Sequence, residues 1–450
     1  MDVKNDIREG NLVKITFTLA WPAILEMMLH TMIWVVDTAM VGRLGAVALS
    51  AVGLGSEILF SVVFIFAAVG VGATAIIARN VGAQNYQRAT FVAEQALVLS
   101  LSLGVVLAAF GLFLIDDIFK AINIEPAVAD LALDYLGIIL WALIFMLPMF
   151  VSVAIMRGTG NNKTPLVIAG ITNFLNLIGD YVLIFGKFGA PAMGVKGAAL
   201  AAAIGNITGS LIALYFIFSH REIIKIKPKN LLRFDLSIFK QIIKLSFPAG
   251  LEEGINNTSR ILFVIMVANM GPVFFAAHQV AVAVESLSFM PGHGFAIAAT
   301  IIVGQNLGAK NFDRSEKGAL TAMKLGLLTM SFMGIVFLVG HNYIVRLFIT
   351  DAKVAYWGAL CIFIASFEQP FLAFYMTLSG ALRGAGDTRW PMYAASIGNW
   401  LIRLPLVYMV VYIWKLSVTA IWIITTVDFA LRSLVVFLRF RKGKWKEIDI

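Results

Sequence analysis

Two carboxylates and two carboxamides stand in apolar surroundings in the first half of this 450-residue chain. Asp37 lies in MIWVVDTAMVG, and Asn173, Asn176 and Asp180 lie in ITNFLNLIGDYVLIF, where steps of three and four residues place them on one helical face. Their oxygens are the ligands that hard cations prefer, and two acids in an apolar cavity tend to share a proton. The pattern predicts a site for H⁺ or Na⁺ and for no other metal. The alternative is that each Asp only bonds to neighbouring hydroxyls and so holds helices together.

The rest of the chain is apolar enough to place these residues inside a lipid bilayer. It is 60% hydrophobic and 14% charged, with a mean hydropathy of +0.88, whereas soluble domains carry about 25% charge. Apolar runs that can span about 30 Å of hydrocarbon recur along it. We therefore predict an all-α integral membrane protein with twelve transmembrane helices, at 15–43, 48–80, 91–115, 129–157, 165–186, 196–219, 241–269, 273–305, 317–341, 352–382, 390–413 and 417–439. A charged side chain in the middle of such a helix costs roughly 2.5–3.5 kcal/mol, so it is expected to have a function.

The chain contains two copies of one unit, offset by 226 residues (247 minus 21). WPAILE at 21–26 returns as FPAGLE at 247–252, ARNVGAQNYQR at 78–88 as GQNLGAKNFDR at 304–314, and MRGTGNNKTP at 156–165 as LRGAGDTRWP at 382–391. Because six helices per copy is an even number, both copies enter the membrane in the same direction, and the repeat is parallel, with a pseudo-two-fold axis along the membrane normal. We expect an N-terminal six-helix lobe at 1–219, a basic cytoplasmic linker at 220–240, and a C-terminal six-helix lobe with a basic cytoplasmic tail at 241–450.

The second copy does not repeat the acids. Its counterparts are apolar: Phe263 for Asp37, Ile402 for Asn176 and Leu406 for Asp180. Only Asn173 keeps a polar counterpart, Asn399. A group needed for packing should recur in both copies, so residues found in one copy predict a function that this lobe alone performs.

Elements shared by both copies are interpreted as scaffold. Glu26 and Glu252 are equivalent, as are Arg157 and Arg383 of the two RG-x-G elements. We expect the glycines to turn the chain between helices and the arginines to anchor at lipid headgroups.

The C-terminal lobe carries further charges in its apolar helices. Glu253, Arg260, Glu285 and Glu368 are predicted to form a second polar cluster. Asp428 and Arg432 stand at i, i+4, where they neutralise each other, and Arg403 is expected to join them.

Basic residues set the predicted orientation. Most Lys and Arg fall in the loops on the side of the amino terminus, including the run Arg221–Lys244 and the tail Arg439–Lys446. By the positive-inside rule, both termini are cytoplasmic. These loops account for the net charge of +9, so no nucleic-acid partner is expected. The first 14 residues lack the apolar core of a cleaved signal peptide, and the single cysteine, Cys361, excludes an intrachain disulfide and suits a helix core.

Enzyme chemistry is not indicated. The five histidines lack HxxxH or HExxH spacing, no Ser or Cys stands in a nucleophile elbow, and there is no ATP-binding loop. We expect no enzyme activity and no cofactor besides a coupling ion, so transport energy must come from an ion gradient.

Several motifs together resemble one family of transporters. They are VVDTAMVGRLG, VGAQN, MRGTGNNKTP, PGHGFAIAATIIVGQNLGA and SGALRGAGDTRWP. The chain resembles the multidrug and toxic compound extrusion family over nearly its whole length, and the duplicated RG-x-G elements are the most specific part. For the DNA-damage-inducible branch, the resemblance implies that a first-helix Asp and a fifth-helix Asn–Asp pair bind the coupling ion, positions matched by Asp37, Asn176 and Asp180. Another branch uses acids in helices 7 and 10, for which Glu253 and Glu368 are loosely fitting counterparts.

The resemblance implies a secondary active multidrug efflux antiporter. It would export amphipathic, mostly cationic organic compounds in exchange for H⁺ or Na⁺ while two lobes rock between access states. We expect a monomer in the bilayer of the cell inner membrane, with small-molecule substrates. One alternative is a lipid-linked oligosaccharide flippase, which needs cations in its cavity; the midmembrane bases here, Arg260, Arg403 and Arg432, each have acids nearby in the sequence-predicted helices. A channel is the other alternative, but it has no need of one-sided acids and broken helices.

Overall fold

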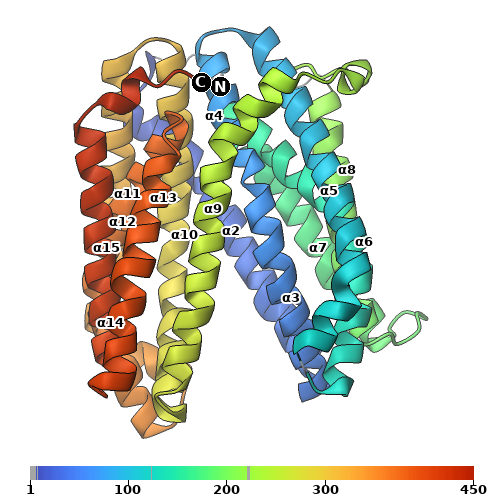
Figure 1. Ribbon diagram of the computed structural model, residues 1–450, viewed down its shortest axis with the longest axis vertical. Helices are drawn as coiled ribbons and strands as arrows, with labels where there is room; N and C mark the ends of the chain where they lie inside the picture. The colour runs from blue at the N-terminus through green and yellow to red at the C-terminus, as the bar shows by residue number, and fades with distance from the viewer. Residues whose placement is uncertain (1–6, 8, 123, 220–222) are drawn as a thin grey trace. The chain divides into compact units, whose positions relative to one another are not determined.

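The computed structural model describes residues 7, 9–122, 124–219 and 223–450. Residues 220–222 of the predicted linker, and Lys4, Arg8 and Arg221 of the predicted basic loops, lie outside the described residues. The described chain is built from long helices (Figure 1), whose bounds are α2 Leu12–Gly42, α3 Ala46–Ala67, α4 Val69–Gly82, α5 Tyr86–Ile122, α6 Pro126–Thr159, α7 Lys163–Phe185, α8 Val195–Phe218, η1 Pro228–Leu232, α9 Leu236–Ala268, α10 Pro272–Gly308, α11 Phe312–Arg346, α12 Ala352–Gly384, α13 Arg389–Ser396, η2 Ile397–Arg403, α14 Leu404–Tyr408, η3 Met409–Ile413, α15 Val418–Arg441 and η4 Lys444–Glu447.

The predicted fold class is confirmed. Among the described residues, eleven helical stretches are long and apolar enough to cross a membrane, with α3 and α4 forming one stretch and Arg389–Ile413 another. The twelfth long helix, α9, carries Glu252, Glu253 and Arg260 in its middle and is not one of the eleven. The helix predicted at 390–413 corresponds to the stretch Arg389–Ile413, within which η2 and η3 are π-helical.

Local sequence explains where these helices end. A helix satisfies its own backbone polar groups, which lipid cannot do, so long apolar runs become helical. The Asp351 carboxylate accepts hydrogen bonds from the backbone N–H groups of Lys353 and Val354, both at 2.9 Å, and so caps the start of α12. Gly160 and Gly186 end α6 and α7 in the left-handed conformation (φ 91° and 67°), which favours glycine.

The described chain divides into two compact units. The N-terminal unit contains residues 25–81 and 85–250, and the C-terminal unit contains the described residues up to Ile24 together with 82–84 and 251–450. The boundaries in α2 and α9 are equivalent in the repeat (24 plus 226 is 250), and each follows a helix proline, Pro22 or Pro248. Each unit therefore includes the first part of the helix that opens the other copy, whereas the sequence boundaries kept each opening helix whole.

The exchanged segments dock in an equivalent way. In the C-terminal unit, the Arg314 guanidinium donates to the Ile7 carbonyl at 3.1 Å and also to the Gly10 carbonyl. In the N-terminal unit, the Gln95 side-chain amide donates to the Arg233 carbonyl at 2.6 Å. Positions 7 and 233 are repeat equivalents, and both carbonyls are held by the third long helix of a copy, α11 or α5.

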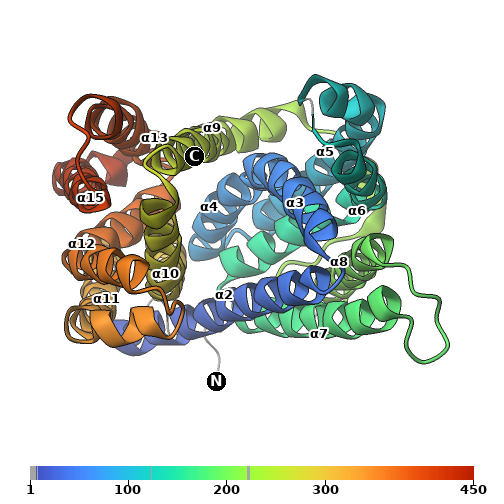
Figure 2. The same ribbon diagram turned by 90° about the horizontal axis from the view of Figure 1, so that it is seen from below.

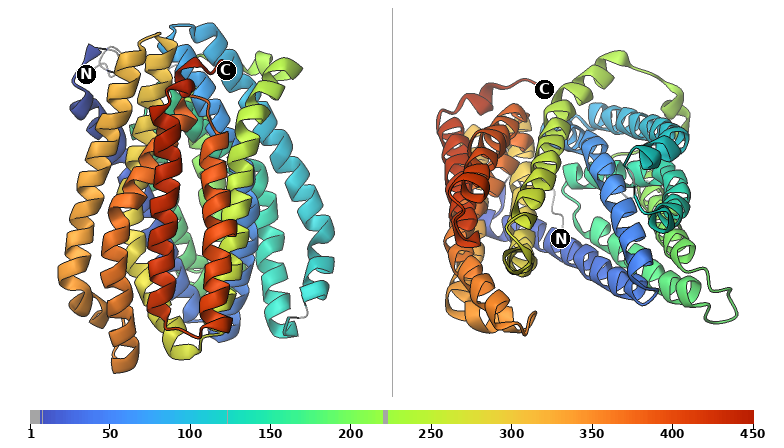
Figure 3. Two further views of the ribbon diagram at one scale, coloured as in Figure 1. Left: turned by 60° about the vertical axis from the view of Figure 1, so that its left-hand side comes forward. Right: turned by 60° about the horizontal axis from the view of Figure 1, so that its bottom comes forward.

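Within each unit one helix lies at the centre. In the N-terminal unit α6 packs against α3, α5 and α8, and α7 packs against α8 (Figure 2). In the C-terminal unit α12 packs against α10, α11 and α15 (Figure 3). Cys361, on α12, is buried as the sequence predicted.

Candidate functional site

The N-terminal unit brings the two predicted acids together. Asp37 comes from α2 and Asp180 from α7, and their carboxyl groups lie within hydrogen-bonding reach of each other. Asp180 is only 2% exposed, and Asp37 is half-buried. A carboxylate is an acceptor only, so a hydrogen bond between two carboxyl groups needs a proton on one of them. The geometry therefore describes a pair that can hold one exchangeable proton.

The two predicted carboxamides lie along the same helix. Asn176, one turn from Asp180 on α7, is buried, and Asn173 is half-buried. The amide nitrogen of Asn173 and one carboxyl oxygen of Asp180 have no hydrogen-bond partner among the described residues. Gly205 lets α8 approach here, because a Cβ at that position would lie 3.4 Å from the Asn176 Cβ. Close helix packing thus holds these polar atoms near one another with hydrogen-bonding capacity to spare.

Two further residues of this site were missed from the sequence. The Tyr135 hydroxyl, on α6, lies 3.2 Å from the Ser56 hydroxyl on α3, and Tyr135 is close enough to Asp37 and Asp180 to interact with their charges. A Cβ at Gly55 would lie 2.8 Å from the Tyr135 ring, so this glycine makes room for it. The repeat could have revealed both residues, because the 226-residue shift matches Tyr135 with Cys361 and Ser56 with Val282. Neither hydroxyl therefore recurs in the second copy.

The repeated Glu and Arg residues form equivalent ion pairs inside the two units. In the N-terminal unit, Arg157 donates to both Glu26 carboxylate oxygens, at 2.8 and 2.9 Å. In the C-terminal unit, Arg383 donates to Glu252 at 2.6 Å, and the Tyr375 hydroxyl donates to the same carboxylate at 3.3 Å. The prediction that the arginines anchor at lipid headgroups is wrong, because each guanidinium is paired with a buried carboxylate instead. The first pair joins α2 to the end of α6, and the second joins α9 to the end of α12.

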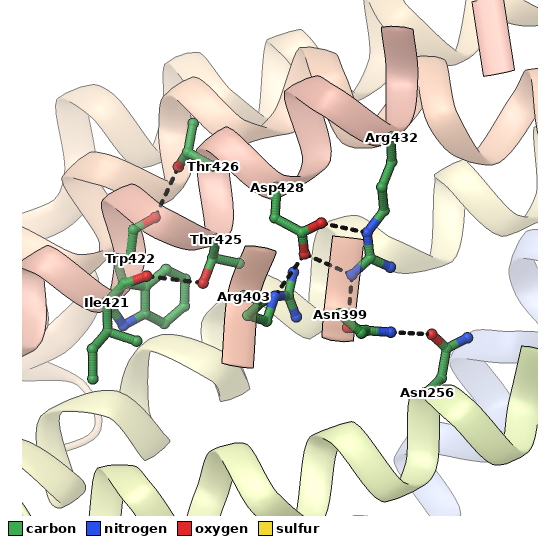
Figure 4. Close-up of polar contacts among 9 residues, drawn as sticks. All are labelled: Asn256, Asn399, Arg403, Ile421, Trp422, Thr425, Thr426, Asp428 and Arg432. Atoms are coloured by element: carbon green, nitrogen blue, oxygen red, sulfur yellow. Dashed lines mark hydrogen bonds and ion pairs between the residues drawn. The ribbon is translucent and has the colours of Figure 1, made fainter. Parts of the chain in front are cut away.

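The C-terminal unit joins several charged and polar side chains in a connected network (Figure 4). Asp428 accepts hydrogen bonds from Arg432 at 2.6 Å, and its carboxylate lies 2.7 Å from the Arg403 guanidinium. Arg432 also donates to Asn399 at 2.6 Å, and the Asn399 amide donates to Asn256 at 2.7 Å. The sequence prediction that Asp428, Arg432 and Arg403 join is confirmed. The two asparagines were not predicted to take part.

The predicted second polar cluster divides into two groups. Glu285 on α10 and Glu368 on α12 lie within hydrogen-bonding reach of each other, with Arg403 near both. Glu253 on α9 lies instead near Glu252, Arg383 and Arg260. Across the described part of the chain, no group of three or more His, Cys, Asp or Glu side chains could hold a metal ion.

Comparison with known proteins agrees with this architecture. The family model MatE matches residues 22–182 and 248–409, one match in each copy of the repeat. A probable multidrug resistance protein NorM of Thermotoga maritima is 34% identical over 431 residues, which cover 95% of this chain and 92% of that protein. Multidrug resistance protein MdtK of Yersinia pseudotuberculosis is 28% identical over 397 residues, 87% of this chain and 86% of that protein.

Solved structures share the fold. A multidrug resistance MATE family transporter of the MOP superfamily in an outward-facing conformation matches with a TM-score of 0.92 and 23% identity, covering 100% of this chain and 99% of that one. MATE in a bent conformation matches with a TM-score of 0.91 and 23% identity, covering 99% of each chain. A two-copy helical membrane protein of this kind is a transporter and not an enzyme. The chain belongs to the MatE family.

Proposed function

We propose that this protein is a secondary active antiporter that exports amphipathic, mostly cationic organic compounds in exchange for H⁺ or Na⁺. The names of its relatives, multidrug resistance proteins, support export of varied small molecules. The chain has 34 Phe and 18 Met, whose side chains suit apolar shapes of many kinds. In this proposal the protein works as a monomer in the cell inner membrane, with both termini in the cytoplasm.

The observation that carries the proposal is the carboxyl pair of Asp37 and Asp180. Together with Asn173 and Asn176 it offers oxygen ligands for Na⁺, or a place for one shared proton, inside an apolar unit. Phe263 and Leu406 replace the two acids in the other copy, so one lobe alone would bind the coupling ion.

Coupling would follow from the position of the pair between two helices. When the ion leaves, a second negative charge appears between α2 and α7, and the helices must repack to separate the carboxylates or solvate them. If the two packings differ in affinity for the drug, then ion and drug each weaken the binding of the other, because coupling between sites is reciprocal.

The flippase alternative is less well supported by the charges of the C-terminal unit. A lipid-linked pyrophosphate would need cationic groups that can bind it. Arg403 and Arg432 both pair with Asp428, and Arg432 also binds Asn399, so both guanidiniums are already engaged by side chains of the protein.

The direct test is Asp37→Asn, assayed as efflux of an ethidium-like dye. We expect gradient-driven efflux to be abolished while the purified protein stays folded and monodisperse in detergent. Asp134→Asn is the matched control, because Asp134 pairs with Lys196 at 3.2 Å on the surface of the same unit. If Asp37→Asn pumps at the wild-type rate, the proposed site is wrong.

The asymmetry of the two copies has its own test. Phe263→Asp, added to Asp37→Asn, should not restore efflux, because the new carboxylate would meet Arg403, whose guanidinium lies 5.9 Å from the Phe263 ring. Rescue by the double variant would mean that the two lobes are interchangeable. The coupling ion itself is identified by transport into proteoliposomes under an imposed ΔpH or ΔNa⁺, applied one at a time.

A further inference from the structure

The last nine residues of the chain fold back onto the end of the C-terminal unit. After α15 ends at Arg441, Gly443 adopts φ 71° and turns the chain, and η4 follows (Figure 3). Trp445 is 1% exposed, stacks on Phe440 with ring centroids 5.0 Å apart, and donates from its indole N–H to the Phe440 carbonyl at 2.8 Å. A tryptophan buried this fully holds the segment in one defined position on the unit.

The same segment fastens two other elements. The Lys446 ammonium lies 2.5 Å from the Glu316 carboxylate in the first turns of α11. Ile450 covers Gly386, in the corner between α12 and α13, since a Cβ at Gly386 would lie 2.5 Å from the Ile450 Cγ2. The tail therefore contacts α11, the α12–α13 corner and α15 together.

The corner that the tail covers is joined to the scaffold. Asp387 in this corner is 5% exposed and pairs with Arg439 of α15 at 2.7 Å, and the Arg439 guanidinium lies 5.3 Å from the Trp390 ring. Four residues before Asp387, Arg383 pairs with Glu252 of α9. A change in the packing of this corner would thus reach the ion pair that ties α9 to α12.

The contacts of the tail and of Asp387 do not recur in the N-terminal copy. The N-terminal copy has Thr90, Asn161, Thr164, Ala213 and Ser219 in place of Glu316, Asp387, Trp390, Arg439 and Trp445. A feature present in one copy only is a candidate for a specific role.

We propose that residues 442–450 form a releasable C-terminal latch that keeps the ends of α11, α12, α13 and α15 moving as one block during transport. The latch is releasable because one of its anchors is a surface ion pair, with Lys446 26% and Glu316 44% exposed. Salt screens such a pair. Its effect on transport rests on the proposed function, whereas its effect on local exchange does not.

Hydrogen exchange in detergent, compared between the wild-type protein and its variants, tests the latch itself. A stop after Arg441 and the variant Trp445→Ala should each speed amide exchange in residues 384–391 by about fivefold or more, with little change in the N-terminal unit. Lys444→Ala is the control, because Lys444 is exposed in the same turn and should leave exchange at the wild-type rate. Wild-type exchange at the corner in the truncated protein would overturn the proposal.

A charge exchange keeps the test valid if truncation impairs folding. Glu316→Lys and Lys446→Glu should each speed exchange at the corner, and the double variant should restore protection. If the double variant does not recover protection from exchange, the ion pair of Lys446 and Glu316 is not part of the latch.

Dye efflux then tests the transport role. The truncated protein and Trp445→Ala should export dye at least about threefold more slowly at equal folded amounts, a loss expected when a moving block is loosened. A wild-type efflux rate with faster corner exchange would overturn this role. If the wild-type protein itself exports no dye, the proposed function fails, and exchange alone decides the latch.

Discussion

In the N-terminal unit the buried Asp180 lies beside a second carboxyl group, whereas in the C-terminal unit the buried Asp428 lies against two guanidinium groups. The first arrangement brings like charges together and gains stability when a cation or a proton enters. The second brings opposite charges together, so Asp428 already has its counter-charges within the protein. The difference teaches that one duplicated scaffold can hold two acids together in one copy and opposite charges together in the other.

The helices that carry these residues differ in the same way. α7 is α-helical from Lys163 to Phe185, whereas its counterpart in the second copy contains the π-helical segments η2 and η3. Asn399 in η2 bonds to both Arg432 and Asn256, but the amide nitrogen of its equivalent, Asn173, has no partner among the described residues. Both Asn399 and Arg403 lie within η2, so the π-helical segment itself supplies two members of the network.

Breaking the network of Asp428, Arg403 and Arg432 should have the largest effect on folding. Asp428→Asn keeps the shape of the side chain but removes the carboxylate that pairs with two buried guanidiniums, so unfolding free energy should fall by about 3–5 kcal/mol. Thermal unfolding in detergent measures this. Thr426→Val on the same helix is the control and should lose no more than about 1 kcal/mol, because Thr426 bonds only to the Trp422 carbonyl of its own helix. A stable Asp428→Asn protein that no longer transports would place Asp428 in the coupling machinery. The proposed contrast between the acid pair of one unit and the structural network of the other would then be wrong.

Removing an acid from the N-terminal pair should spare folding and stop transport. Asp180→Asn can still hydrogen-bond to Asp37 and no longer places two like charges together, so its unfolding midpoint should equal or exceed that of the wild type. Gradient-driven dye efflux should fall at least about a hundredfold, to the background of passive leak. A variant that loses stability and transport in parallel would show that Asp180, like Asp428, serves helix packing and not ion coupling.

Most of the fold could be predicted from the sequence, because lipid leaves so few options. Apolar runs must become helices in a bilayer, and the repeat gave the number of copies and their direction. The division of α2 and α9 between the two units could not be read in this way, since no residue of either helix marks which unit its leading half will contact. The π-helical segments were also out of reach: IGNWLIR has the same helical pattern as the stretch of α7 that it matches.

For the site, one-copy residues were a better guide than buried charge alone. Asp37 and Asp180 were predicted from their place in apolar helices and singled out by this asymmetry, and the structure places them together. Tyr135 and Ser56 pass the same filter but went unnoticed, because a tyrosine and a serine in apolar helices do not signal chemistry by type. The cluster of Glu253, Arg260, Glu285 and Glu368 rested on charge without geometry, and it divides because α9 and α10 place their acids beside different partners.

Tyr135 offers a milder test of the acid pair. Tyr135→Phe removes the hydroxyl that meets Ser56 and should cost about 1 kcal/mol of stability. If the hydroxyl helps to position the two acids, efflux should also fall, by less than about tenfold, and its pH dependence should shift. Ser56→Ala is the control, because it removes the same hydrogen bond and leaves the Tyr135 hydroxyl in place. Equal effects of the two variants on efflux would confine Tyr135 to packing.

The smallest effect is expected where the two copies differ at one corner. In the N-terminal unit Asn161 bonds to Thr164 at 2.7 Å, and in the C-terminal unit the equivalent Asp387 pairs with Arg439. Burial raises the pKa of the Asp387 carboxyl group above its ordinary value of 3.8, and the hydrogen bond and charge of Arg439, with the charge of Arg389, only partly oppose this.

Because the folded protein holds this proton more tightly than the unfolded chain does, the contribution of Asp387 to stability is full below pH 3.8 and is lost as pH rises through its folded pKa. Asp387→Asn does not titrate. Its unfolding midpoint should therefore rise relative to that of the wild type as the pH increases from about 4 to about 7, even though Arg439 loses its counter-charge. Unfolding midpoints measured across this range check the slope, with Asn161→Asp as the matched change in the other copy. Parallel profiles for Asp387→Asn and the wild type would mean that Arg439 fully offsets burial, and that the two corners differ in chemistry but not in energy.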